Sequence, residues 1–174
     1  MQGASILTLY AILVVAVVQD MTSMKISNRL IGMGLLLALA FGLFLGGVPR
    51  MFQVLLNSSL PVIVLYLLYL IGVLGAGDIK LFSVIGAFTN FKTWTDCMVA
   101  AFVAGAGIAL AKMLMQRNLS VSLLKARIFL GELVSGKTAS YRDGWVEEKN
   151  LMHFSVAILL GLLYAHRAIW QAWV

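Results

Sequence analysis

The chain alternates between long apolar stretches and short polar connections over most of its 174 residues. Residues 1–19 carry no charge, and uncharged runs follow at 30–49 and 51–77. A helix of about 20 apolar residues crosses the roughly 30 Å hydrocarbon core of a bilayer. The pattern therefore predicts membrane-spanning helices, with a fourth segment that is short or partly buried. The six predicted helices cover residues 1–19, 30–49, 51–77, 79–91, 95–115 and 151–170.

The composition supports this interpretation. Hydrophobic residues make up 61% of the chain and charged residues 11%, whereas soluble domains are about 45–50% apolar and about 25% charged. Such a chain has too few charges to cover a water-facing surface, which also excludes disordered, collagen-like, coiled-coil and disulfide-rich classes. We expect an all-α, polytopic membrane protein with about six transmembrane helices, forming one domain over residues 1–174.

The basic residues indicate an orientation in the membrane. The chain has 13 Lys and Arg against 7 Asp and Glu, a net charge of +6. Ten of the basic residues fall in the first, third and fifth connections, and two in the second and fourth. By the positive-inside rule the odd connections, including a polar loop at about 116–150, are cytoplasmic. We expect a multi-pass protein of the cytoplasmic (inner) membrane that contacts anionic lipid and binds no nucleic acid.

Cysteine and histidine are too scarce for several kinds of site. Cys97 is the one cysteine, and His153 and His166 lie in the same predicted helix. This set forms no intramolecular disulfide and no zinc site, so we expect no metal and no cofactor. It also gives no convincing Cys/His or Ser/His/Asp arrangement.

The acidic residues are the most informative set. Four of the seven lie in the 116–150 loop, and Asp96 is interpreted as the N-cap of the fifth helix. Asp20 and Asp78 remain, both at the edge of an apolar helix on the predicted cytoplasmic side. An ionisable group at membrane depth costs a few kcal/mol and is a functional candidate for that reason. The structural alternatives are a helix-terminal Asp20 and an Asp78 that caps the next helix.

The residues before Asp78 strengthen its candidacy. In Gly75-Ala-Gly77-Asp78 two glycines remove side-chain bulk, so the backbone can bend and an extended chain can approach. If the two carboxyl groups come close, one keeps its proton and the other is ionised. The ionised group can then activate water while the protonated group polarises a peptide carbonyl, which is the chemistry of aspartic hydrolysis.

These segments resemble a known family. Asp20 followed by Lys-Ile-Ser-Asn-Arg-Leu at 25–30 is similar to one motif of the type IV prepilin peptidases, and Gly-Ala-Gly-Asp-Ile-Lys-Leu at 75–81 matches their GxGD motif. Residues 152–161 are similar to the family's last helix. The resemblance implies a membrane aspartic protease that cleaves short basic leaders from prepilin-like precursors at the cytoplasmic face, just before the hydrophobic pilin helix.

The resemblance also implies roles for individual residues. Asp20 and Asp78 would be the catalytic pair, and substrate binding or loop flexibility would fall to Gly75, Gly77, Lys80 and Asn28.

The chain departs from the family pattern in three places. Ser27 and His153 stand where the family has proline. The long cysteine-containing first loop of the bifunctional enzymes is absent, as in the short, peptidase-only forms of tight-adherence pilus systems and archaeal preflagellin processing.

Two other classes of function remain open. The first is a small transporter or proton-relay protein that uses Asp20 and Asp78 as a carrier pair. It would favour carboxylates near mid-membrane and an inverted repeat, and the sequence indicates neither. The second is a non-catalytic membrane scaffold, which gives no reason for Gly75 and Gly77 beside a lone acid.

Overall fold

The computed structural model describes residues 2–115 and 153–171, and within these residues all regular secondary structure is helical. This confirms the predicted all-α class. The predicted 116–150 loop lies outside the described residues. The helices are α1 (Gln2–Ser23), α2 (Asn28–Leu70), α3 (Ala76–Phe88), α4 (Phe91–Met115) and α7 (Phe154–Gln171).

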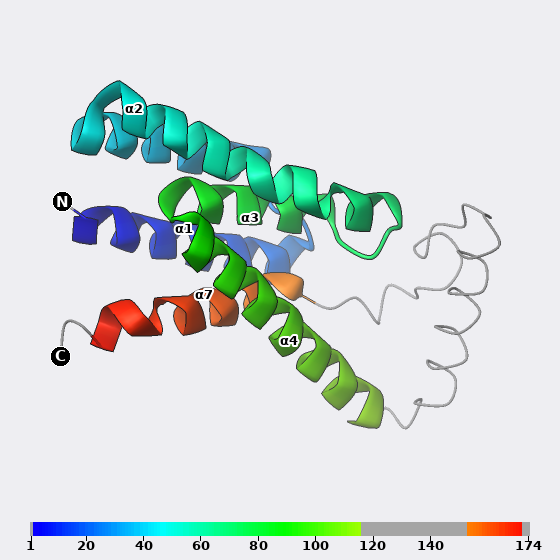
Figure 1. Cartoon of the computed structure of the whole chain (residues 1–174). Coiled ribbons are helices and arrows are strands. Elements are labelled where there is room, and N and C mark those ends of the chain that lie inside the picture. Colours follow the sequence, from blue (N-terminus) through cyan, green and yellow to red (C-terminus); the bar gives the residue numbers. More distant parts are fainter. Residues whose placement is uncertain (1, 116–152, 172–174) are drawn as a thin grey trace.

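Helix α2 is a hairpin of two arms rather than one rod. The helical path breaks at Gly47, whose φ of 66° and ψ of −158° suit a residue without a Cβ. The arms, residues 28–46 and 48–70, run side by side in opposite directions (Figure 1). Pro49 lies in the first turn of the second arm, where its missing N–H leaves no intrahelical bond unmade. The two helices predicted at 30–49 and 51–77 correspond to these arms.

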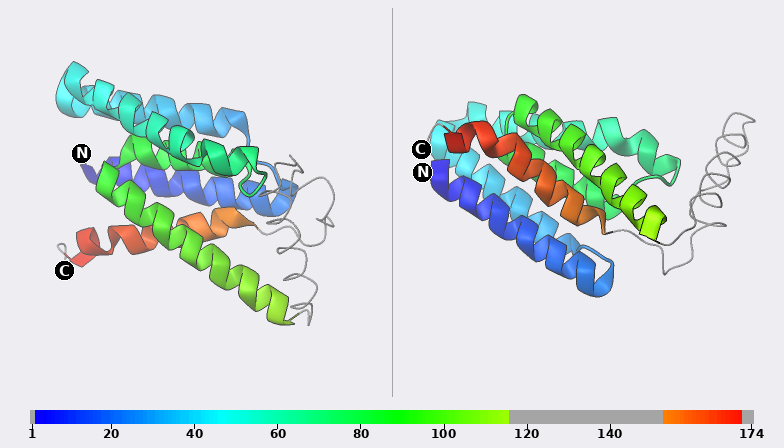
Figure 2. Two further views of the ribbon diagram at one scale, coloured as in Figure 1. Left: turned by 45° about the vertical axis from the view of Figure 1, so that its right-hand side comes forward. Right: turned by 90° about the horizontal axis from the view of Figure 1, so that it is seen from below.

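Successive helical segments run up and down the bundle, so their ends gather at its two ends. In Figures 1 and 2, α1, the second arm of α2 and α4 all finish at the end where the first arm of α2, α3 and α7 begin. We call this the common end. The first connection and the 71–75 turn lie there, and the N-terminus of α1 lies at the opposite end.

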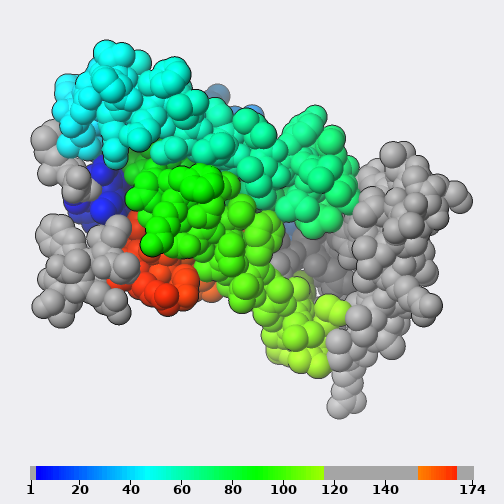
Figure 3. All heavy atoms as spheres, viewed as in Figure 1, coloured from blue at the N-terminus to red at the C-terminus, as the bar shows by residue number. Residues whose placement is uncertain are grey.

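Helix α3 is the centre of the fold. Leu81, Phe82, Val84 and Ile85 are fully buried on it, and a helix that is apolar on all sides belongs in an interior. Its 13 residues extend about 20 Å, less than the thickness of a bilayer core. In the space-filling view α2 covers one edge of the molecule and α7 the other, with green residues of α3 and α4 between them (Figure 3). This agrees with a short, buried fourth segment.

A proline and a glycine let α2 and α3 approach closely. Pro61 has no N–H to bond the Asn57 carbonyl four residues earlier in α2. That carbonyl oxygen faces Gly86 of α3, where any Cβ would collide with it. Beside it, the Ser83 hydroxyl donates a 2.6 Å hydrogen bond to the Ser58 carbonyl. Backbone carbonyls near the proline are thus used to hold the central helix.

The outer faces of the long helices are apolar. Within the residues that the structure describes, α1, α2 and α4 are the helices long and apolar enough to cross a membrane, and their exposed side chains are those of a lipid-facing surface. Examples on these helices are Leu7, Leu36, Phe44, Ile63 and Val103. The chain is therefore a membrane protein, while a count of about six spans stays a prediction.

Two predicted helix boundaries are wrong. The third predicted helix was expected to reach residue 77, but α2 ends at Leu70 and a turn that contains Gly72 at φ 77° follows. Asp96 does not cap a helix: α4 begins at Phe91, and the Asn90 side chain accepts a hydrogen bond from the Thr93 N–H at 2.8 Å. The end of α2 was missed because the sequence stays apolar through the turn that follows it. The start of α4 was misplaced because the capping residue is Asn90, five residues before the predicted start.

Candidate active site

Asp20 lies in the last turn of α1, at the common end, and its side chain is 16% exposed. Its Oδ2 accepts a hydrogen bond of 2.6 Å from the Ser155 hydroxyl, near the start of α7. The Nδ1 atom of His153 lies 3.5 Å from the same oxygen. Asp20 is therefore held from the last helix of the chain, 135 residues away in sequence.

Asp78 lies in the first turn of α3 and is half-buried. Asp78 is not the N-cap residue of α3, since Gly75 occupies that position. The interpretation of Asp78 as an N-cap is thus wrong. Gly75 has φ −75° and ψ 147°, an extended conformation that any residue can adopt. The backbone conformation therefore does not require glycine, and the reason for glycine is the limited space beside its Cα. A Cβ on Gly75 would lie 3.0 Å from Asp78 Oδ2.

Gly77 has a different position from the one that the motif suggested. It belongs to the first turn of α3 rather than to the preceding turn. A Cβ there would meet the Ile26 side chain at 3.5 Å, an ordinary contact. The connection between α1 and α2 therefore packs against the first turn of α3, which carries Asp78.

Asn28 and Lys80 are brought together. Lys80 Nζ donates a hydrogen bond to Asn28 Oδ1 at 2.8 Å, joining the first residue of α2 to α3. In the same connection Ser27 caps α2: its hydroxyl accepts from the Arg29 N–H at 3.3 Å, and its own N–H donates to Gln19 Oε1 at 3.0 Å. A serine N–H can make this bond to α1, whereas the proline of the family pattern has no N–H to donate.

These contacts make a single region from three parts of the chain. α1 packs directly against α3 and α7, and the turns that carry Asp20 and Asp78 both lie at the common end (Figure 1). The structure thus places both predicted carboxylates, and the predicted residues Asn28, Gly75, Gly77 and Lys80, at one end of the bundle.

Sequence reasoning missed the contribution of α7. Ser155 was part of a family-like segment without an assigned role, and His153 looked like a residue at a helix boundary. The available signal was their place at the start of an apolar helix whose preceding loop is on the same side as Asp20. That signal predicts that Ser155 and His153 lie at the same membrane face as Asp20, but it does not predict that they contact Asp20.

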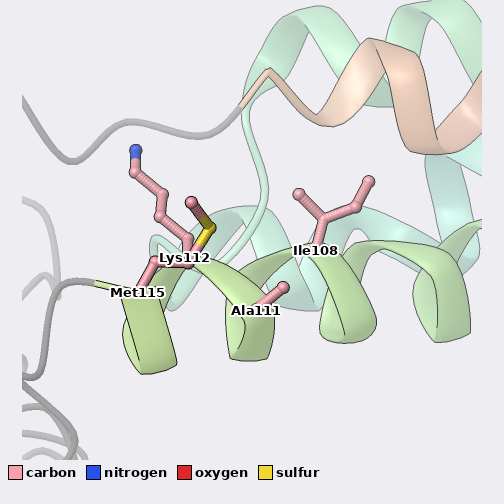
Figure 4. A pocket seen from close by; sticks show the side chains of 4 residues that line it. All are labelled: Ile108, Ala111, Lys112 and Met115. Carbon is pink, nitrogen blue, oxygen red and sulfur yellow. The ribbon is translucent and has the colours of Figure 1, made fainter.

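A separate hollow lies near the end of α4. Its described lining residues are Ile108, Ala111, Lys112 and Met115, and Figure 4 shows Ile108 and Lys112 pointing to the same side of the helix. It includes neither aspartate. Among residues 2–115 and 153–171 no group of three His, Cys, Asp or Glu side chains could hold a metal ion.

The fold and this region together define an all-helical membrane protein with two half-buried aspartates at one end of its helix bundle. Comparison with protein-family models matches residues 7–110 to the type IV leader peptidase family, and the chain belongs to this family. The comparisons with curated proteins and with solved structures returned no match. Membership confirms the resemblance drawn from the motifs and gives a type IV leader peptidase role, with prepilin-like proteins as the implied substrates. The matched segment contains Asp20 and Asp78 and ends before α7.

Proposed function

We propose that Asp20 and Asp78 are the catalytic pair of an aspartic leader peptidase of the GxGD type. One observation carries the proposal. Of the three carboxylates in the described residues, Asp20 and Asp78 lie at the common end, on helices that pack directly against each other. The third, Asp96, lies in the second turn of α4, which starts at the other end of the bundle.

The pair can hydrolyse a peptide bond by general acid–base catalysis. Two carboxyl groups that meet at the bond share one proton, because repulsion opposes two charges. The ionised group takes a proton from water as the water oxygen bonds to the carbonyl carbon, and the protonated group gives its proton to the carbonyl oxygen. On collapse, the C–N bond breaks as the nitrogen takes the proton from the base, and the hydroxyl proton returns to the acid. One water is consumed.

The proposed substrate is a prepilin-like precursor with a short basic leader, cleaved just before its hydrophobic helix. The common end also carries Lys25, Arg29 and Lys80, which supports a cytoplasmic location by the positive-inside rule. We propose that residues 1–174 form one peptidase domain in the cytoplasmic membrane, crossing it several times, with the 116–150 loop in the cytoplasm. The short first connection favours a peptidase-only form.

Three matched substitutions test the proposal. Asp20→Asn and Asp78→Asn keep the size of each side chain but cannot cycle a proton. Each should lower leader cleavage by at least about a hundredfold while the protein still accumulates in the membrane. Asp96→Asn makes the same chemical change at the other end of the bundle and should cleave normally. The assay is a gel shift of a co-expressed pilin-like precursor.

The assay also separates the peptidase from its rivals. Near-normal cleavage by Asp20→Asn or Asp78→Asn would remove that residue from the catalytic pair. A wild-type protein that leaves every basic-leader precursor intact would instead favour the transporter or scaffold.

A further inference from the structure

The connection between α1 and α2 is tied back to α1 by a side chain beside Asp20. Gln19 precedes Asp20 near the end of α1, and its Oε1 accepts a 3.0 Å hydrogen bond from the N–H of Ser27, the N-cap of α2. We propose that Gln19 is a positioning residue, which holds this connection so that it keeps the turn of Asp78 in place for cleavage. The inference rests on the proposed catalytic pair and deepens it.

The end of α1 starts the connection at a fixed point. Met24 has φ 51°, and its N–H donates to the Asp20 carbonyl at 2.9 Å, a left-handed closure that often ends a helix. The Ser23 hydroxyl donates to the Gln19 carbonyl at 2.8 Å. The chain thus leaves the helix directly after the turn that carries Gln19 and Asp20. The Gln19 side chain then bridges from this turn to Ser27.

The other contacts of the connection reach the first two turns of α3. Ile26 is partly buried, and its side chain would lie 3.5 Å from a Cβ on Gly77. Asn28 accepts the 2.8 Å hydrogen bond from Lys80. Gly77 and Lys80 lie on either side of Asp78 in sequence. A change in the path of the connection therefore reaches the turn that carries this carboxylate.

Ser27 has a backbone conformation that suits a proline. Its φ is −65° and its ψ 131°, and the ring of proline fixes φ near −65°. The proline of the family pattern would hold this φ by its ring. Serine is held instead by two hydrogen bonds, from its N–H to Gln19 and from the Arg29 N–H to its hydroxyl. Gln19 thus supplies part of the constraint that the ring would give.

The test is steady-state cleavage by the full chain in lipid vesicles. The probe is a fusion with a short Lys/Arg leader, a glycine before the cleavage bond and an apolar helix of about 20 residues. Gln19→Met removes the acceptor and keeps the length of the side chain. We expect kcat to fall about fivefold with KM within about twofold, because the carboxylates are misplaced while the substrate still binds.

Gln53→Met is the matched control. The Gln53 Oε1 also accepts a hydrogen bond, from Arg50 at 3.2 Å, but toward the opposite end of the bundle. This variant makes the same chemical change and should cleave normally, so an equal loss in Gln53→Met and Gln19→Met would overturn the proposal.

Ser27→Pro is the decisive variant. It cannot donate to Gln19, but its ring sets the same φ, so kcat should stay within about twofold of the wild type. Ile26 belongs to neither helix, so a proline after it interrupts none. In this background Gln19→Met should have no further effect, because its partner is already gone. A further loss in the double variant would show that Gln19 acts elsewhere, and would overturn the proposal.

Ser27→Ala separates the two hydrogen bonds of Ser27. It keeps the N–H and removes the hydroxyl that caps α2, so the unfolding midpoint in detergent should fall by about 3 °C. The kcat should stay within about twofold, since the bond to Gln19 remains. If Ser27→Ala lowers kcat as much as Gln19→Met does, the cap of α2 positions the carboxylates and the role of Gln19 is rejected.

The remaining outcomes separate this inference from the catalytic pair. An unchanged kcat in Gln19→Met, with Asp20→Asn and Asp78→Asn inactive, would reject the positioning role and leave the pair standing. Cleavage by either asparagine variant would reject the pair, and with it this inference. If Gln19→Met fails to accumulate, Ser27→Pro and its double variant with Gln19→Met still decide the proposal, and equal rates support it.

Discussion

Lys80 of α3 and Asn28 at the start of α2 are joined side chain to side chain, with the lysine Nζ 2.8 Å from the amide oxygen. Sequence reasoning gave both residues a part in substrate binding or loop flexibility. Their contact ties the first two turns of α3, and with them Asp78, to the connection that follows Asp20. The pair is exposed, so its contribution to folding is small.

Breaking this contact should affect cleavage more than stability. Lys80→Met and Asn28→Ala each remove the hydrogen bond, and each should lower the cleavage rate about fivefold by loosening the position of Asp78. Unfolding in detergent should change by less than about 1 kcal/mol. If both act through their mutual bond, the double variant should be no slower than either single one. Lys92→Met, an exposed lysine in the first turn of α4, is the control.

A different result would give Lys80 a direct role. If Lys80→Met is far slower than Asn28→Ala and the two effects multiply, the lysine acts on the substrate rather than through Asn28.

The apolar runs predicted the helices well because their length and uniformity are what a bilayer demands. The same uniformity hid the turn between α2 and α3. Residues 71–75 read Ile-Gly-Val-Leu-Gly, as apolar as a helix, and the turn depends on the positive φ of Gly72. Hydropathy does not distinguish an apolar turn at Gly72 from a continuing helix. By contrast, Pro49 and Arg50 marked the reversal within α2 to within a few residues.

The candidate site was predictable only in part, because the apolar sequence makes its charged residues conspicuous but not its other polar residues. Asp20 and Asp78 stand out because charge is rare next to apolar helices. Ser155 and His153 do not, since a serine and a histidine at the start of a helix are common. Their contact with Asp20 depends on how α7 packs against α1, and no local pattern encodes a pairing over 135 residues.

The contact of α4 with α7 depends on a glycine. A Cβ at Gly161 would lie 2.5 Å from the Cys97 carbonyl oxygen and 2.8 Å from the Ala101 nitrogen. Both are backbone atoms that cannot move aside, so Gly161→Ala should destabilise the protein by about 1–3 kcal/mol. Gly107→Ala in α4 is the matched control, since nothing lies within 4 Å of its Cβ position. Thermal unfolding in detergent would measure both, and equal midpoints would contradict the close packing.

The orientation in the membrane can be checked with single cysteines. After Cys97→Ala removes the one native thiol, Lys25→Cys places a thiol at the common end and Lys92→Cys places one at the opposite end. Because the odd connections hold most of the positive charge, an impermeant maleimide added to intact cells should label Lys92→Cys only. Lys25→Cys should react after permeabilisation. The reverse pattern would put both aspartates outside the cell and reject cytoplasmic leader cleavage.

The two glycines of the GxGD motif should respond differently to alanine. From sequence alone both are candidates for the same role, but a Cβ on Gly75 would face the Asp78 carboxylate, whereas a Cβ on Gly77 would face the Ile26 side chain. A Cβ on Gly75 would lie 3.0 Å from Asp78 Oδ2, and the carboxylate, as the end of a side chain, can turn away. Gly75→Ala should therefore fold normally and lower kcat about tenfold, because a displaced carboxyl group no longer meets the peptide bond.

Gly77→Ala, in the first turn of α3, is the matched comparison. Its Cβ would make an ordinary 3.5 Å contact with Ile26, and alanine favours a helix over glycine by about 1 kcal/mol. This variant should unfold at the same or a higher temperature and keep most of its cleavage rate. Steady-state cleavage and thermal unfolding, measured on both variants, show which of the two glycines cleavage requires. If Gly77→Ala is the slower enzyme while Gly75→Ala is normal, the motif serves backbone bending during substrate entry, and the space beside Asp78 is not what glycine provides.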